Sequence, residues 1–360
     1  MKRTLALGGL VATAGLLAAG LAAPAQAAGK GWSHDNMAPT NSAALQVIKY
    51  WRGERASNFE KATPYAVETK VAAKHLSKGG PSADSKPGVV PAIGDEKKSS
   101  STSKNVNLPK TTGKVFFRGA DGKPHWCTAT SVQSTYHNLV ATAGHCVYDT
   151  QSNKATMDYW VFVPGYYQGK TPWGIYVGKT AYTHYDYDVY EDGDRDYAFV
   201  TVYNGVLPSW EKRKLVIKDV GRLGDNVGGQ GLAYNQKIGS SVYVFGYPSG
   251  SHPDGNHAFS GKTLKWSYGK TFAATAPAIK GEELQGVKSS FTGEGSLGSA
   301  WLVQYKSARR LGYLNGVTIG VSDTDGNDRY DTSVSPYFDG ETYGVYNAAK
   351  NNWSGKITAQ

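Results

Sequence analysis

Beyond residue 111 the chain consists of short segments in which hydrophobic and polar residues alternate. Glycine, asparagine, aspartate and proline separate these segments, a pattern typical of strands joined by turns. A region of this length and texture suits one β-sandwich or a pair of β-barrels. No internal repeat with a period of about 20 to 50 residues indicates a solenoid or a propeller. The clearest predicted strands are residues 114–117, 159–163, 197–202, 241–245 and 300–305.

The N-terminal part of the chain has a different pattern. Residues 41–62 begin with a helix-capping residue and show partial helical periodicity, which predicts a short helix. Residues 76–110 are rich in lysine, serine, glycine and proline and too polar to bury a core. We therefore expect residues 28–111 to form a largely disordered leader that ends in a polar linker. A domain at residues 112–360 follows it.

The first residues of the chain resemble an export signal. Lys2 and Arg3 precede an apolar run at residues 5–23, and Ala-Gln-Ala at residues 25–27 supplies a signal-peptidase pattern. A transmembrane helix is the alternative, but the run is rich in glycine and alanine and ends in a cleavage-type sequence. No later stretch reaches the roughly 18 apolar residues of a membrane span. We expect a signal peptide at residues 1–27, a secreted, extracellular protein and no membrane span.

Composition and charge narrow the class of protein further. The 44 glycines, 24 tyrosines and 9 tryptophans are typical of an all-β domain rich in turns. The net charge is +10, and loss of Lys2 and Arg3 with the signal leaves +8. This charge favours anionic partners such as cell-wall polymers, or forms only a solvated basic surface. Nucleic acid is not an expected partner because the chain has neither a basic helix nor an aromatic-basic RNA-binding motif.

Two cysteines, Cys127 and Cys146, are the whole inventory. In an exported protein such a pair favours a disulfide over a zinc site, which needs further ligands at short spacing. Loop-entropy arguments give a bridge of this span a stabilisation of about 3 kcal/mol.

The most specific motif ends at His145. Two predicted strands contain the stretches Cys-Thr-Ala-Thr-Ser-Val, at residues 127–132, and Leu-Val-Ala-Thr-Ala-Gly-His-Cys, at residues 139–146. A disulfide at Cys146 would fix the backbone that carries the imidazole, although an isolated histidine is more often structural than catalytic. This segment resembles the His region of the chymotrypsin-like serine peptidases. The resemblance implies an Asp and then a Ser further along the chain.

Asp196 is the candidate for the acid. The resemblance implies an aspartate about 40 to 60 residues after the histidine that opens a strand, and Asp196, followed by Tyr-Ala-Phe-Val, lies 51 residues beyond His145. In the family this carboxylate accepts the imidazole proton and holds the tautomer. The alternative is that Asp196 merely belongs to an acidic turn at residues 186–196.

The nucleophile falls in the stretch Thr-Gly-Glu-Gly-Ser-Leu-Gly-Ser-Ala-Trp at residues 292–301. Bacterial members of the family carry a Thr-Gly-Gly-Ser-Ser-Gly-Gly-Pro-Trp type of sequence there. Alignment from Thr292 puts the nucleophile at Ser296, whereas alignment from Trp301 puts Leu297 in its place. We choose Ser296 because neighbouring glycines give the sharp turn that a nucleophile requires. The alternative is a turn that no longer does chemistry.

The resemblance also implies the remaining parts of the site. The backbone N–H groups of Glu294 and Ser296 would form the oxyanion hole, and residues Leu314, Asn315 and Gly316 would form the substrate strand. The stretch Phe-Gly-Tyr-Pro at residues 245–248 is similar to one in glutamyl-endopeptidase-like relatives. The histidine that recognises glutamate substrates there has no counterpart, so glutamate specificity is not expected.

A last motif is the acidic stretch at residues 323–331. Oxygen-bearing side chains alternate around a glycine, as in the first part of a calcium loop, but the twelfth place is Val334 instead of an acid. A structural calcium site and a plain turn both remain open. The candidate ligands are Asp323, Asp325, Asn327 and Asp331.

Together these features predict an all-β protein of two antiparallel six-stranded barrels of the chymotrypsin-like type. The predicted function is a monomeric, secreted serine endopeptidase that acts on polypeptides through His145, Asp196 and Ser296 and requires no cofactor. The rival hypothesis is a catalytically inactive protein of the same fold that binds peptides or cell-envelope polymers. An esterase with the same triad is a third possibility.

Overall fold

The computed structural model describes residues 31–52, 57–67, 70–97, 102–152 and 155–359. The predicted signal peptide lies outside these residues. Within them, no helix combines the length and the apolar character needed to cross a membrane.

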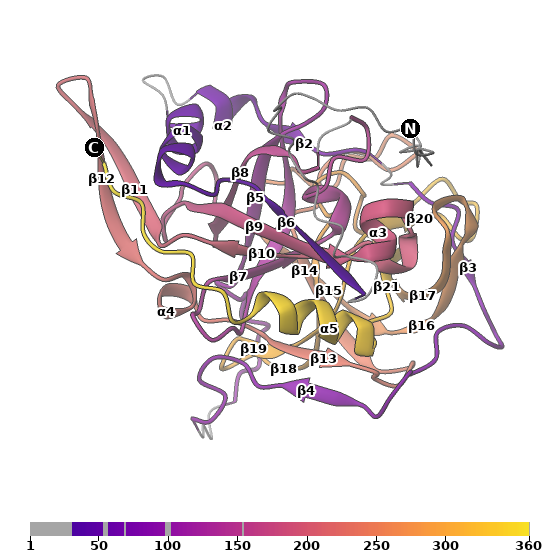
Figure 1. Ribbon diagram of the computed structural model, residues 1–360. Helices are drawn as coiled ribbons and strands as arrows, with labels where there is room; N and C mark the ends of the chain where they lie inside the picture. The colour runs from indigo at the N-terminus through magenta and orange to yellow at the C-terminus, as the bar shows by residue number, and fades with distance from the viewer. Residues whose placement is uncertain (1–30, 53–56, 68–69, 98–101, 153–154, 360) are drawn as a thin grey trace, which may run out of the picture.

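The first half of the domain is a closed six-stranded barrel (Figure 1). Its strands pair in the order β9-β10-β7-β6-β5-β8, and pairing of β8 with β9 closes the cylinder. Three of the predicted strands fall in β5, β8 and β10 and are confirmed. The six strands are β5 (Thr112–Arg118), β6 (Pro124–Val132), β7 (Leu139–Thr142), β8 (Asp158–Pro164), β9 (Tyr176–His184) and β10 (Ala198–Val202).

The second half is a half-barrel made of two sheets. The first sheet has the strand order β15-β14-β18-β19-β13-β4 and the second has the order β20-β21-β17-β16-β3. The predicted strands at residues 241–245 and 300–305 are confirmed in β14 and β18. The strands are β3 (Lys74–His75), β4 (Gly88–Val90), β13 (Gly231–Tyr234), β14 (Ser241–Gly246), β15 (Lys265–Lys270), β16 (Phe272–Ala276), β17 (Gly281–Lys288), β18 (Ala300–Lys306), β19 (Leu311–Val317), β20 (Gly320–Ser322) and β21 (Thr332–Pro336).

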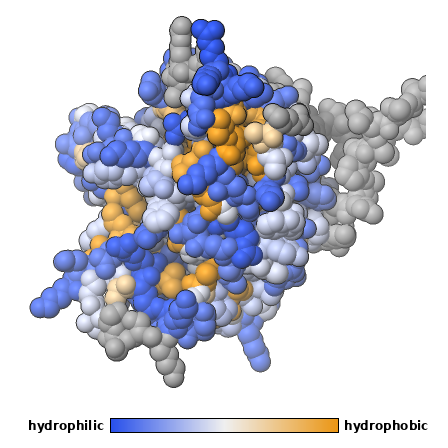
Figure 2. All heavy atoms as spheres, turned by 90° about the vertical axis from the view of Figure 1, so that its left-hand side faces the viewer, coloured by the Kyte–Doolittle hydropathy of each residue, from blue (hydrophilic) through white to orange (hydrophobic). Residues whose placement is uncertain are grey.

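Short helices and one hairpin complete the domain. Helix α5 (Gly340–Ala349) begins with a capping box at Asp339 and lies against the first barrel. The hairpin of β11 (Gly205–Glu211) and β12 (Lys214–Gly221) projects at the left of Figure 1. The face that it shares with the first helix of the leader shows several separate hydrophobic areas among hydrophilic ones (Figure 2). The other short helices are α3 (Tyr185–Tyr190), α4 (Leu223–Val227), η1 (Gly144–Cys146), η2 (Gly193–Arg195) and η3 (Pro277–Ile279).

The leader is built into both halves of the domain, which differs from the expected disorder. Strand β1 (Trp32–Asn36) extends the first barrel beside β9, and β2 (Thr63–Pro64) runs parallel to β6. Strands β3 and β4 pair with β16 and β13 of the half-barrel. The predicted helix is present as α1 (Asn41–Trp51), followed by α2 (Ser57–Lys61).

Backbone pairing explains why a polar leader is ordered. Its strands satisfy their N–H and C=O groups on sheet edges, which requires few hydrophobic side chains. A few apolar anchors add to this pairing, among them Trp51 of α1, whose ring packs 5.6 Å from that of Phe116. Phe117 points the other way into the core of the barrel, so α1 buries the outer face of β5.

Candidate active site

His145 lies in the short helix η1, directly after β7, and is fully buried. The disulfide between Cys127 and Cys146 is present, which confirms the predicted bridge. It joins β6 to the residue that follows His145. The backbone that carries the imidazole is therefore held by β6 through the disulfide and by β7 through the chain itself.

Asp196 holds His145 through two contacts. One carboxylate oxygen accepts a hydrogen bond from Nδ1 of the imidazole at 2.5 Å, and the other accepts the backbone N–H of His145 at 2.9 Å. Both side chains are buried. Gly144 permits this approach, because a Cβ there would lie 2.9 Å from the carboxylate and 2.5 Å from the Tyr187 ring. The pair leaves Nε2 as the imidazole atom that can exchange a proton with a reactant.

Asp194 lies close to this pair and connects the two halves of the domain. Its carboxylate accepts the backbone N–H groups of Glu282 and Glu283 in β17, at 3.0 and 2.8 Å. Burial raises the pKa of Asp194 to about 6. The segment that supplies Asp196 is therefore anchored to the second half of the domain by a neighbouring carboxyl group.

Ser296 lies in a chain of tight turns. Gly295 and Gly298 flank it with positive φ angles of 77° and 80°, which glycine adopts without strain. A Cβ at Gly298 would lie only 2.0 Å from the Thr128 carbonyl oxygen. This turn is therefore seated against β6 immediately after Cys127, the partner of Cys146 in the disulfide.

The hydroxyl of Ser296 is directed into its own turn. Its Oγ lies 2.6 Å from the carbonyl oxygen of Thr292 and 3.0 Å from that of Gly293, and the side chain is fully buried. A hydroxyl carries a single proton, so these carbonyls share its donor. Within the described part of the chain, the Ser296 hydroxyl forms its hydrogen bonds with these two carbonyls and not with His145.

Leu297 occupies the other place that the two sequence alignments allow for the nucleophile. Its side chain is fully buried and belongs to the core cluster that also contains Cys146, Tyr65 and Val71. Its carbonyl oxygen accepts the N–H of Thr128 at 2.8 Å. The residue thus packs beneath the site as an ordinary core side chain.

One of the two N–H groups predicted for the oxyanion hole is bonded within the turn itself. The N–H of Ser296 donates to the Gly293 carbonyl at 3.0 Å, which uses one of the two expected donors. The carbonyl of Glu294, the residue that would supply the other donor, accepts the N–H of Ser249 at 2.7 Å. Its carboxylate faces Gly250, where a Cβ would lie 2.5 Å from it.

The residues predicted as substrate strand lie in the interior of a sheet. Leu314, Asn315 and Gly316 belong to β19, which pairs with β18 on one edge and with β13 on the other. The pairing with β13 ends at Leu314, and at the next residue the side chain of Gln285 donates to the Asn315 carbonyl at 2.6 Å. These partners cover both edges, so the segment offers no open edge to a substrate backbone. The sequence pattern identified a strand but could not tell an interior strand from an edge strand.

The acidic loop is organised by its own backbone. The Asp323 carboxylate accepts the N–H groups of Gly326, Asn327 and Asp328. Asp331 forms an ion pair with Lys288 at 2.7 Å. In the described part of the chain, no group of three or more His, Cys, Asp or Glu side chains is arranged to hold a metal ion. The side chain of Asp325 is also bonded within the loop, where it accepts a hydrogen bond from the Asn327 side chain at 3.1 Å.

Sequence reasoning missed one residue at the site. Tyr65 of the leader is buried and its ring centroid lies 6.5 Å from that of His145, with 29° between the planes. A single tyrosine in a polar leader carries no pattern that could have revealed this contact.

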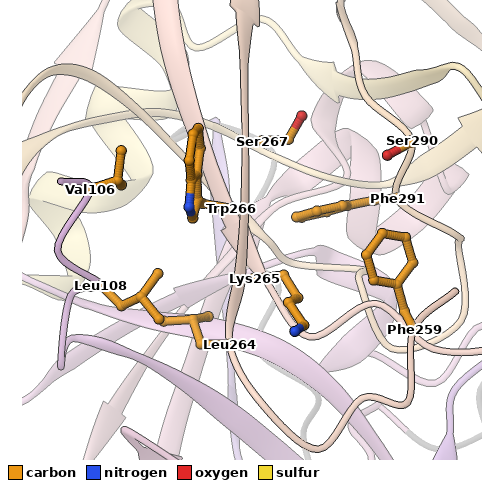
Figure 3. Close-up of a pocket in the computed structure, with 9 residues that line it drawn as sticks. All are labelled: Val106, Leu108, Phe259, Leu264, Lys265, Trp266, Ser267, Ser290 and Phe291. Carbon is orange, nitrogen blue, oxygen red and sulfur yellow. The ribbon is translucent and has the colours of Figure 1, made fainter.

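A separate pocket of about 480 Å³ lies on the second half of the domain (Figure 3). Val106 and Leu108 of the leader form one side and Trp266 of β15 stands beside them, with Phe259 and Phe291 opposite. The pocket shares no residue with the His145 and Asp196 pair.

Comparisons with known proteins add the following. No protein-family model matches the chain, and no curated protein matches it in sequence. Solved structures do match in fold. The protease Anisep from Arthrobacter nicotinovorans has a TM-score of 0.53 at 28% identity, covering 68% of this chain and 97% of that one. The thermostable serine protease AL20 from an extremophilic microorganism has a TM-score of 0.53 at 25% identity, covering 67% and 97%.

Both of these proteins are proteases, and each matches the chain over nearly its whole own length. The closed barrel, the half-barrel and these likenesses support a peptidase-like function. The chain has the double-barrel fold of the chymotrypsin-like serine proteases.

Proposed function

We propose that the chain is a secreted serine endopeptidase in which His145 is the general base, Asp196 orients it and Ser296 is the nucleophile. The observation that carries the proposal is the buried pair of His145 and Asp196, joined at 2.5 Å and held by a second bond to the backbone. A buried carboxylate beside an imidazole costs desolvation, and it stabilises the imidazolium that forms during acyl transfer.

The chemistry proceeds in two halves. Ser296 Oγ attacks the scissile carbonyl carbon while His145 Nε2 takes the hydroxyl proton, and the imidazolium then gives that proton to the leaving amine. Water then attacks the acyl-enzyme, gives a proton to His145 and releases the acid as the proton returns to Ser296. An ester substrate would follow the same route with an alcohol as the leaving group.

The proposal requires the turn around Ser296 to rearrange. The hydroxyl must exchange the carbonyls of Thr292 and Gly293 for His145, and the Ser296 N–H must leave Gly293 to face a developing oxyanion. These are local rotations within a turn that already contains two glycines with positive φ angles.

The second candidate function is binding of peptides or cell-envelope polymers without cleavage. It is favoured by the Ser296 hydroxyl, which is bonded within its own turn, and by Leu297, which fills the place given by the alignment from Trp301. In this case the nucleophile has been lost by substitution at residue 297, and the His145 and Asp196 pair remains as a structural element.

Labelling with a fluorophosphonate probe separates the two candidates, because the probe reacts with activated serines. We would compare the parent chain with Ser296→Ala and Leu297→Ser, before and after limited proteolysis of the leader. Labelling of the parent that Ser296→Ala abolishes supports the peptidase. Labelling of Leu297→Ser alone overturns it and identifies a site whose nucleophile has been replaced.

Export, partners and metal belong to the same proposal. We propose that residues 1–27 are removed on secretion, and the disulfide is compatible with an oxidising compartment. The protein would act as a monomer on polypeptides, and its basic surface would hold it near anionic cell-wall polymers. Catalysis would need no cofactor, and the role of calcium would be limited to stiffening the loop at residues 323–331.

A further inference from the structure

We propose that the leader, through residues 63–67 and 70–75, occupies the peptide-binding cleft of the proposed active site and closes it in the full-length chain. This inference rests on the proposed function, because the cleft is the place where a substrate would meet His145 and Ser296. It is carried by the contacts that the leader makes with His145 and with β20.

The first contact covers His145. After β2 the N–H of Tyr65 donates to the Trp126 carbonyl of β6 at 2.9 Å, which fixes the tyrosine over the first barrel. Its ring is only 3% exposed and stacks on the imidazole of His145 at 6.5 Å. His145 has no exposed surface beneath it. A peptide could not place its carbonyl against the imidazole while this ring remains there.

The second contact covers the edge of β20. One edge of this short strand pairs with β21, and the leader lies along the other edge, where Lys70 pairs with Val321 in parallel. The N–H of Val71 donates to the Val321 carbonyl at 3.0 Å, and that of Ala73 donates to the Ser322 hydroxyl at 3.1 Å. Pairing with a strand edge is the way in which extended peptides commonly bind to proteins.

The edge of β20 belongs to the same site as the Ser296 turn. Thr318, two residues before β20, accepts the N–H of Gly298 at 2.7 Å and donates its own N–H to Ser299 at 3.1 Å. The strand that the leader covers is therefore bonded, through Thr318, to the turn that carries the candidate nucleophile.

After its contact with β20, the leader pairs with a further strand of the half-barrel. Strand β3 pairs with β16, with Lys74 opposite Thr275 and His75 opposite Ala274. The segment is thus anchored at β6, at β20 and at β16. Because it is part of the same chain, its effective concentration at the cleft exceeds that of a free peptide, and it must leave before a substrate can pair with β20.

The side chains of the leader also indicate what the cleft accepts. Val71 and Ala73 are buried against the domain, whereas Ala72 between them is exposed. This alternation is that of a bound extended strand. An occupant with small apolar residues at two alternate positions fits the edge of β20.

The test measures access to His145 instead of catalysis. The full chain would be treated with diethyl pyrocarbonate at neutral pH, and modification of each histidine followed by mass spectrometry. Val71→Asp forces a carboxylate into the buried contact with β20, whereas Ala72→Asp places the same charge on the exposed neighbour. We expect the modification rate of His145 to rise at least tenfold in Val71→Asp and to stay at the parent value in Ala72→Asp.

Two other histidines serve as internal references. His257 is exposed and should react at one rate in every variant. His252 is buried and its Nδ1 accepts the N–H of Tyr330, so its modification reports unfolding. If the modification rates of His252 and His145 rise together, Val71→Asp has unfolded the chain. Val71→Ala and Tyr65→Ala are then measured instead, and a rise at His145 without a rise at His252 is again the expected result.

Two results would overturn the proposal. In the first, His145 is modified in the folded parent chain as fast as His257. In the second, the modification rate of His145 stays unchanged when both leader contacts are weakened. Loss of protection without any fluorophosphonate labelling would leave the leader proposal standing and contradict the peptidase. Labelling of the parent with the leader in place would contradict the leader proposal alone.

Discussion

The contact between Asp196 and His145 leads to a direct prediction at the scale of single residues. Asp196→Asn keeps the size of the side chain, but only its oxygen can accept a hydrogen bond, whereas the carboxylate accepts both the Nδ1 and the backbone protons of His145. With the oxygen on the backbone N–H, the NH2 group faces Nδ1 and donates to it. The imidazole is then held in the wrong tautomer. We expect the rate of peptide hydrolysis to fall by on the order of 10³ to 10⁴. Asp188→Asn, in helix α3, should leave the rate within about twofold of the parent, and an equal loss in this variant would contradict the role assigned to Asp196.

Asp194 predicts a pH dependence of stability. Burial raises its pKa to about 6 in the folded protein, above the ordinary value of 3.8. The folded state therefore binds the proton more tightly than the unfolded state, so this group stabilises the fold at low pH and loses that contribution as pH rises from about 4 to about 6. We expect the Tm of the parent, relative to Asp194→Asn, to fall over this interval. Parallel Tm profiles of the two proteins would contradict the assignment.

The position of His145 beside the disulfide was predictable from the sequence, whereas the orientation of the Ser296 hydroxyl was not. The first is marked by contiguous residues, since a small-residue strand ends in a histidine beside a cysteine. The second depends on a hydroxyl rotamer set by the carbonyls of Thr292 and Gly293. No sequence pattern distinguishes a serine that faces a base from one that faces its own turn.

At the scale of elements, the disulfide connects the strand that seats the Ser296 turn to the helix that carries His145. Replacing both cysteines by alanine removes a cross-link that closes a loop with a sequence separation of 19. Loop-entropy arguments give a loss of about 3 kcal/mol in the free energy of unfolding. Urea denaturation of the parent and the double variant measures it. A loss below about 0.5 kcal/mol would show that β6 and η1 are held by their other contacts.

The strands of the domain were predictable because half-buried strands alternate, and residues 114–117, 159–163, 197–202, 241–245 and 300–305 all lie in or overlap strands. The leader was not predictable in the same way. Strands such as β2 and β3 have two residues each and are ordered by backbone pairing with other parts of the chain, which leaves no periodicity to detect. The same limit applies to Leu314, because neighbours in space decide whether a strand is interior.

At the scale of the whole molecule, the leader and the two halves of the domain form one unit around His145. The first barrel carries His145 and Asp196, the half-barrel carries the Ser296 turn and the edge of β20, and the leader contacts both. The site lies at the junction of the two halves, and Tyr65, Val71 and Ala73 of the leader pack into the core cluster that contains Cys146 and Leu297.

The most direct test of this account is hydrolysis of casein by the full-length chain with the leader released by Val71→Asp, beside the same variant carrying Ser296→Ala. We predict that Val71→Asp hydrolyses casein at least tenfold faster than the parent chain and that Ser296→Ala removes this activity. Activity that survives Ser296→Ala would contradict the assigned nucleophile. A folded Val71→Asp chain with His145 accessible and no hydrolysis would contradict the peptidase and leave a binding protein with a covered cleft.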